Sequence, residues 1–71
     1  MDIEFKIINV LKKLKIDIYN GKYEIDSLKR ITLWYELENE FGIIIDDEDY
    51  WQAQDDTISS LLKLINGYVK K

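Results

Sequence analysis

In three separate stretches of this 71-residue sequence, apolar residues recur every three or four positions. This spacing puts apolar side chains on one face of an α-helix, so each stretch predicts an amphipathic helix. The stretches are residues 3–14, 27–41 and 57–68, and the chain has no proline and only three glycines to interrupt them. The pattern therefore predicts an all-α fold, in which the apolar faces of the helices meet in one small core.

The first and last stretches have one apolar stripe each. The first follows Asp2, whose side chain can cap a helix start. Its stripe consists of Ile3, Ile7, Val10, Leu11 and Leu14. The last follows Asp55, Asp56 and Thr57, any of which can be its cap. Its stripe consists of Ile58, Leu61, Leu62, Ile65 and Val69. Both helices are therefore predicted to pack one face on a shared core.

The middle stretch carries two apolar stripes. At about 100° per residue, one stripe is predicted to face the core and consists of Leu33, Trp34, Leu37 and Phe41. The second points to nearly the opposite side and consists of Leu28, Ile31 and Tyr35. Gly42 suits the left-handed position that ends a helix. We predict that the second stripe is an exposed contact surface; the alternative is that it packs under the preceding loop or the third helix.

The connecting segments contain a turn signal and a short helix signal. In "KIDIYNGKYEI", residues 15–25, Asn-Gly favours a β-hairpin, but the flanks are short for strands. We predict instead a loop that packs on the helices. In "DDEDYW", residues 46–51, Asp46 can cap a short third helix, with Tyr50 and Trp51 anchoring it. The prediction is one domain over residues 1–71, a small four-helix bundle of three main helices and one short helix.

Composition excludes several classes of function. The chain has no cysteine and no histidine, which removes disulfides, thiolate metal sites and the commonest general base. Its net charge is −4, and residues 36–71 hold nine acidic against three basic side chains. Such a surface repels nucleic acid and suits partners with basic patches, although it also serves solubility alone. With no stretch of about 18 unbroken apolar residues and no secretory signal, we expect a cytoplasmic protein without a membrane span.

Neither a metal site nor a catalytic group is predicted. Counted from Asp46, the acid-rich segment has Trp51 where an EF-hand calcium loop needs glycine, and Thr57 where it needs glutamate. Helix capping and solvation explain these acids better. Glu36 and Glu40 lie one helical turn apart, but both are predicted to be exposed, so nothing would separate their pKa values for acid–base work. We therefore predict that the chain is not an enzyme.

Ser27 lies at the start of the middle helix, between Asp26 and Leu28. Either Asp26 or Ser27 can accept a hydrogen bond from the amides of the first turn, so helix capping alone explains a serine here. No histidine is present to activate its hydroxyl as a nucleophile. Ser27 is nevertheless a candidate site residue because of its position: the second apolar stripe begins beside it and continues along the same helix.

The residues around Ser27 resemble the carrier proteins of fatty acid, polyketide and nonribosomal peptide synthesis. The resemblance is carried by "DSL" at 26–28, "LWYELENEFGI" at 33–43, "DDED" at 46–49 and "INGY" at 65–68. It implies an acyl-carrier-protein-like bundle with a 4'-phosphopantetheine arm, derived from coenzyme A, on Ser27 and with Asp26 as its acidic neighbour. The arm would hold an acyl or aminoacyl group as a thioester. The docking residues that the resemblance implies are Leu28, Ile31 and Tyr35, with Glu36 and Glu40 as charge partners.

The same resemblance implies the partners of such a protein. They are a phosphopantetheinyl transferase, an acyl- or aminoacyl-loading enzyme, and a downstream synthase or transferase, and the carrier itself is expected to be a stand-alone monomer. The sequence departs from the family where Glu24 and Ile25 replace the usual Leu-Gly, and where Lys29 and Arg30 replace an acid. The alternative is a carrier-like interaction module that has no arm and uses Ser27 as a helix cap.

Overall fold

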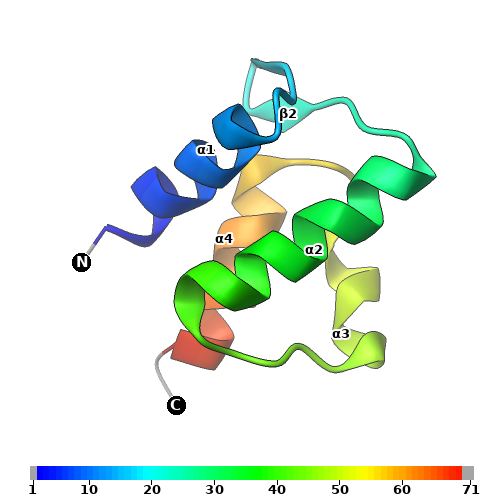
Figure 1. The fold of residues 1–71 in the computed structure, drawn as a ribbon. Helices are drawn as coiled ribbons and strands as arrows, with labels where there is room; N and C mark the ends of the chain where they lie inside the picture. The colour runs from blue at the N-terminus through cyan, green and yellow to red at the C-terminus, as the bar shows by residue number, and fades with distance from the viewer. Residues whose placement is uncertain (1, 70–71) are drawn as a thin grey trace.

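Each of the three long amphipathic patterns forms a helix in the computed structural model, which describes residues 2–69 of the chain (Figure 1). Helix α1 spans Ile3–Lys13, α2 spans Ser27–Phe41 and α4 spans Ile58–Val69. The short third helix, α3, spans Asp47–Tyr50 and continues into a 3-10 turn, η1, at Trp51–Ala53. These elements confirm the predicted small all-α bundle, with the ends of the long helices within one residue of the prediction.

The core forms where α1, α2 and α4 turn their apolar faces toward one another. Its helical members are Ile7, Val10, Leu11, Leu33, Trp34, Leu37, Leu61, Leu64 and Ile65. The connecting segments add Ile16, Tyr23, Ile45 and Ala53. The predicted stripe of α2 is confirmed except that Phe41 is half-buried, and in α4 Leu64 is buried more deeply than Leu62. Because burying one large aliphatic side chain contributes about 1.5–3 kcal/mol, this cluster is the main source of stability.

Local chemistry sets where the long helices begin and end. The Asp2 side chain accepts a hydrogen bond from the Phe5 N–H at 3.1 Å, which confirms it as the cap of α1. Gly42 ends α2 in the left-handed conformation, with φ of 64°. Before α4, the hydroxyl of Thr57 accepts a hydrogen bond from the Ser60 N–H at 3.2 Å, so Thr57 caps that helix. These caps satisfy backbone groups that the helices themselves leave without partners.

The segment predicted as a loop forms a β-hairpin instead, so that prediction is wrong. Strand β1, at Ile18–Tyr19, pairs antiparallel with β2, at Lys22–Tyr23. The turn residues Asn20 and Gly21 have φ values of 51° and 73°. The type I′ hairpin turn needs positive φ at both central positions, and Asn-Gly is strongly preferred there.

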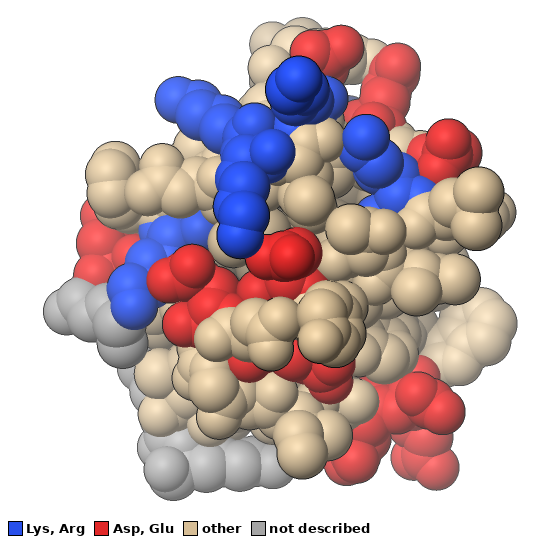
Figure 2. All heavy atoms as spheres, viewed as in Figure 1, with Lys and Arg blue, Asp and Glu red and all other residues tan. Residues whose placement is uncertain are grey.

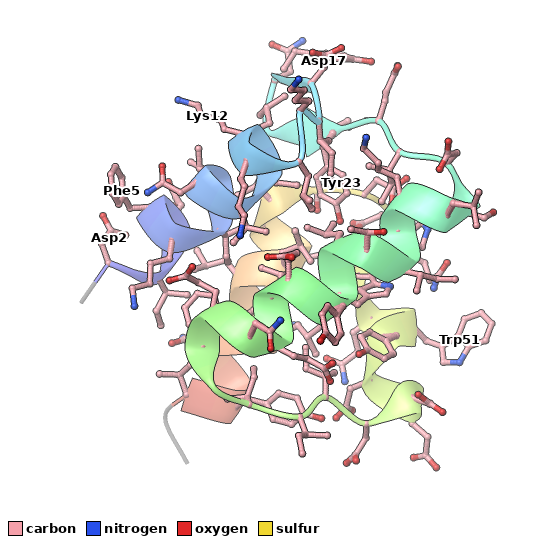
Figure 3. The ribbon with its side chains drawn as sticks, viewed as in Figure 1. Asp2, Phe5, Lys12, Asp17, Tyr23 and Trp51 are labelled. Carbon is pink, nitrogen blue, oxygen red and sulfur yellow. The ribbon has the colours of Figure 1, made fainter. Side chains whose placement is uncertain are left out.

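A hairpin this short is stable because it is bonded to the segment that precedes α4. The Tyr23 N–H donates to the carbonyl of Asp56 at 3.0 Å, and the Ile58 N–H donates to the carbonyl of Gly21 at 2.8 Å. The Tyr23 ring is almost completely buried, and its label in Figure 3 lies toward the middle of the bundle. The hairpin is therefore held in place by the segment before α4, which is distant from it in the sequence.

Of the two aromatic residues expected to anchor α3, only Tyr50 does so. Its ring centroid lies 4.9 Å from that of Trp34, and its hydroxyl donates to Glu38 Oε2 at 3.2 Å. Trp51 is 74% exposed and points away from the bundle (Figure 3), so the prediction for Trp51 is wrong. Asp46 precedes α3 as predicted, but its side chain forms no capping hydrogen bond.

Candidate functional site

At the start of α2, the structure decides between the two candidate caps. Asp26 has an extended backbone, with φ of −91° and ψ of −179°, and its Oδ1 accepts a hydrogen bond from the Lys29 N–H at 2.7 Å. The Asp26 carbonyl accepts a backbone bond from the Arg30 N–H at 2.9 Å. Ser27 is the first residue inside the helix. The cap of α2 is therefore Asp26 and not Ser27.

The Ser27 side chain is exposed and forms no hydrogen bond with any of residues 2–69. Because Asp26 already serves as the cap, the hydroxyl has no part in holding the first turn. The first N–H groups of a helix have no partner within it, and they form the positive end of its dipole. The dipole of this 15-residue helix would therefore favour an anionic ester on the Ser27 oxygen.

The second apolar stripe of α2 is open to solvent. Leu28, Ile31 and Tyr35, hereafter the exposed stripe, are 79%, 66% and 63% exposed. The alternative in which these residues pack under a loop or under α3 is therefore wrong. Toward α3 the stripe borders an open groove of about 340 Å³, lined by Ile31, Trp34, Tyr35, Glu38 and Tyr50. Exposed apolar side chains grouped in this way make the stripe a candidate surface for contact with another molecule.

Glu36 and Glu40 are not on the exposed stripe, because they lie on the side of α2 that faces α1. Glu36 Oε2 is 3.0 Å from Lys13 Nζ, and Glu40 Oε2 is 3.8 Å from Lys6 Nζ. The Glu36 side chain is only 25% exposed, so the predicted exposure is wrong for Glu36 and correct for Glu40. Both carboxylates already have a cationic partner within the chain.

The two cations that follow Ser27 have different environments. The Arg30 guanidinium is half-buried and bonds both carboxylate oxygens of Asp56, at 2.6 and 3.0 Å. This bidentate pair joins the first turn of α2 to the segment before α4. Lys29 is exposed and forms no ion pair with residues 2–69. Beside Ser27, the charged side chains without an ion-pair partner among residues 2–69 are therefore those of Lys29 and Asp26.

An open depression of about 500 Å³ lies next to the helix start, lined by Tyr23, Glu24, Ile25, Asp26 and Asp56. The Tyr23 hydroxyl is buried and has no hydrogen-bond partner among residues 2–69. Burial, with the negative charge of Asp56 as a smaller cause, raises the pKa of Tyr23 far above its usual range. The hydroxyl therefore stays protonated, and Tyr23 acts as a core residue beneath the site.

Sequence reasoning missed two carboxylates that hold the site together, Glu38 and Asp56. Glu38 Oε2 accepts hydrogen bonds from the Ile45 N–H at 2.8 Å and from the Tyr50 hydroxyl at 3.2 Å. Burial and the Glu38 charge raise the pKa of Tyr50 to about 12. Glu38 follows Trp34 by four positions, so its place beside the core stripe was a signal for this role. Nothing in the sequence pairs Asp56 with Arg30.

Within the described part of the chain, no group of three or more acidic residues is arranged to hold a metal ion. In residues 2–69, none of the helices combines the length and the apolar character needed to cross a membrane.

Comparisons of the chain with models of protein families, with curated proteins and with solved structures find no match. A functional interpretation therefore depends on the geometry around Ser27 and on the sequence resemblance to carrier proteins.

Proposed function

We propose that the protein is a stand-alone carrier that holds an acyl or aminoacyl group as a thioester on a 4'-phosphopantetheine arm attached to Ser27. One observation carries the proposal: the Ser27 hydroxyl is exposed and unbonded at a helix tip that Asp26 already caps. A transferase can therefore reach and modify this oxygen without removing a bond that the fold needs. The thiol of the bound arm would supply the chemistry, since the chain has neither histidine nor cysteine.

The residues of the helix start suit the attachment chemistry. In the transfer, Ser27 Oγ forms a bond to the phosphorus of the pantetheine phosphate of coenzyme A, and the adenosine bisphosphate leaves. The hydroxyl proton goes to a base on the transferase, because this chain has no histidine to take it. The dipole of α2 would stabilise the phosphodiester charge by about 0.3–1 kcal/mol. The neighbouring Lys29 also favours this charge, whereas the Asp26 carboxylate opposes it.

The exposed stripe supports a carrier role, because a carrier must be recognised in turn by several enzymes. Leu28 follows Ser27 directly, so an enzyme that covers the stripe also reaches the arm. The same stripe favours a second candidate, an interaction module of similar fold that has no arm. That module would keep the contact surface. It would not use Ser27 as its helix cap, however, because Asp26 caps α2.

Intact mass spectrometry separates the two candidates. The protein is incubated with coenzyme A and a broad-specificity phosphopantetheinyl transferase, and the expected result is a gain of one phosphopantetheine group. Ser27→Ala should abolish the gain. Ser59→Ala is the matched control, because Ser59 is also an exposed serine in the first turn of a helix, and this variant should be modified like the wild type. A folded wild-type protein that gains no mass supports the interaction module instead.

A further inference from the structure

The groove between the exposed stripe and α3 contains a carboxylate that has no cationic partner. Glu38 is half-buried there, and its Oε2 accepts hydrogen bonds from the Ile45 N–H at 2.8 Å and from the Tyr50 hydroxyl at 3.2 Å. Its Oε1 forms no hydrogen bond with residues 2–69, and no lysine or arginine of that range forms an ion pair with Glu38. The structural bonds therefore account for one oxygen and leave the negative charge without a counter-charge.

Aromatic side chains form much of the wall of this groove. Its volume is about 340 Å³, and it is lined by Ile31, Trp34, Tyr35, Glu38 and Tyr50. The ring centroids of Trp34 and Tyr50 are 4.9 Å apart, and Tyr35 is 63% exposed. Aromatic rings attract cations, and tryptophan does so most strongly. Because Glu38 is the only charged residue of these five, the groove suits an organic ammonium group and disfavours an anion.

Acidic side chains also gather on the α3 side of the groove. The first turn of α3 contains Asp47, Glu48 and Asp49. Figure 2 shows acidic side chains at the lower right, where α3 lies in Figure 1, and basic side chains over the upper part of the same face. Burial raises the pKa of Tyr50 to about 12, and the charges of Glu38 and Asp47 contribute to this increase. The negative potential of these acids therefore reaches the wall of the groove.

Ser27 lies on the same side of α2 as the groove. At about 100° per residue, Ile31 and Glu38 fall within about 40° of Ser27 around the helix axis. The distance along the axis from position 27 to position 38 is about 16 Å. An extended phosphopantetheine arm is of similar length, so the thioester end of an arm on Ser27 can lie over the groove. The group that the groove contacts is then the cargo at the end of the arm.

We infer that the groove formed by Trp34, Tyr35 and Glu38 binds the ammonium group of an aminoacyl cargo, and that the carrier is therefore loaded with an amino acid and not with a simple acyl group. The inference depends on the proposed function, because the cargo reaches the groove on the Ser27 arm. The ammonium group lies against the aromatic rings and supplies the counter-charge that Glu38 lacks. A methyl group in the same place leaves that carboxylate unpaired and desolvated, which is unfavourable.

The test compares two cargoes of the same shape, glycyl and propionyl, in which an ammonium group replaces a methyl group. A broad-specificity phosphopantetheinyl transferase transfers each to Ser27 from a coenzyme A derivative whose stable amide replaces the thioester. At about pH 6.5 the amino group is protonated. The NMR signal of the Trp34 indole N–H, compared with that of protein carrying an unloaded arm, reports occupancy of the groove, and the exposed Trp51 is the internal reference. Glycyl should occupy the groove about two- to fivefold more than propionyl, the factor that a cation–π contact at an exposed site supplies.

Three variants identify the groups that recognise the ammonium. Glu38→Gln keeps the shape of the side chain and an oxygen for its two hydrogen bonds, and it should abolish the difference between the cargoes. Glu40→Gln removes the same charge from the side of α2 that faces α1, so this matched control should keep the difference. Tyr35→Leu removes an exposed ring without opening the core, and it should reduce the glycyl signal independently of Glu38. Circular dichroism verifies that every variant is folded.

The possible failures of the inference and of the proposed function are distinguishable. Equal perturbation of Trp34 by both cargoes in the modified wild type overturns the inference and leaves the carrier function intact. A preference for glycyl that persists in Glu38→Gln and in Tyr35→Leu also overturns it, because the ammonium group would then bind elsewhere. A folded wild-type protein that accepts no arm overturns the carrier function, and the inference with it.

Discussion

Replacing Asp26 and Ser27 by alanine, one at a time, is expected to affect stability and modification in opposite ways. Asp26→Ala removes the 2.7 Å hydrogen bond from the Lys29 N–H and leaves the start of α2 without a cap. Loss of such a cap costs about 1 kcal/mol, within a range of about 0.5–2 kcal/mol. For a chain of this length the total stability is roughly 4–11 kcal/mol, so the loss is a measurable fraction of it.

Ser27→Ala should leave stability almost unchanged. The hydroxyl that it removes bonds none of residues 2–69, and alanine has a higher helix propensity than serine. We expect a change within about 0.5 kcal/mol in either direction. The same variant should nevertheless lose all modification by the transferase, because the attachment oxygen is gone.

Thermal and urea unfolding followed by circular dichroism measure the difference. A loss of about 1 kcal/mol lowers the midpoint temperature of a domain of this size by about 4–8 °C, well beyond experimental error. Asp26→Asn is the control, since asparagine caps helices about as well as aspartate and should keep most of the stability. The reasoning is refuted if Ser27→Ala costs about 1 kcal/mol or more while Asp26→Ala costs nothing, because the serine would then be the cap.

Three further measurements test the interactions around the site. Arg30→Gln breaks the half-buried bidentate pair with Asp56 and should cost about 1–3 kcal/mol in urea unfolding; Arg30→Lys should recover only part, and full recovery would show that two-point bonding is irrelevant. Trp34→Ala should cost about 3–5 kcal/mol and abolish the near-ultraviolet dichroism of its contact with Tyr50; a small loss would contradict its place in the core. Burial raises the pKa of Tyr23 above its usual range, and burial with a nearby carboxylate raises the pKa of Tyr50 to about 12. The stability that the two protonated tyrosines contribute should be complete below about pH 10, the pKa of tyrosine in an unfolded chain, and should fall as the pH rises toward 12. A urea midpoint that stays unchanged across that range would refute this prediction.

The helices and the core could be predicted from the sequence because helical periodicity is a local property. The apolar stripes of α1, α2 and α4 follow from the spacing of their residues alone. Each stripe lies on one face of its helix, so that face is the one expected to pack on the core. The hairpin could not be predicted on the same basis. The Asn-Gly turn signal was correct. Whether its short flanks form strands, however, depends on hydrogen bonds to Asp56 and Ile58, which lie more than thirty residues away in the sequence. Local patterns carry no information about such partners.

Within the candidate site, the sequence pointed to individual residues but did not show how they are arranged relative to one another. Asp26 and Ser27 are both good caps, and only the backbone conformation at the helix start shows which one is outside the helix. Tyr50 and Trp51 are neighbours in one short helical segment, so their side chains point about 100° apart and only one can face Trp34. The ion pairs of Glu36 and Glu40 depend on how α1 crosses α2, which no single-helix pattern contains.

The small core explains why the functional features of this chain lie on its surface. A domain of this length buries only about 60% of the surface of its unfolded chain, and here the Trp34 ring of α2 packs against the Tyr50 ring of α3. A closed catalytic cleft has little room in such a fold. What the fold can provide is a rigid point of attachment. Because Asp26 caps α2, Ser27 is released from that role, and one hydroxyl is held at a fixed position beside an apolar stripe. The proposed carrier function needs no more from the fold than this fixed hydroxyl, because the thiol would come from the bound arm.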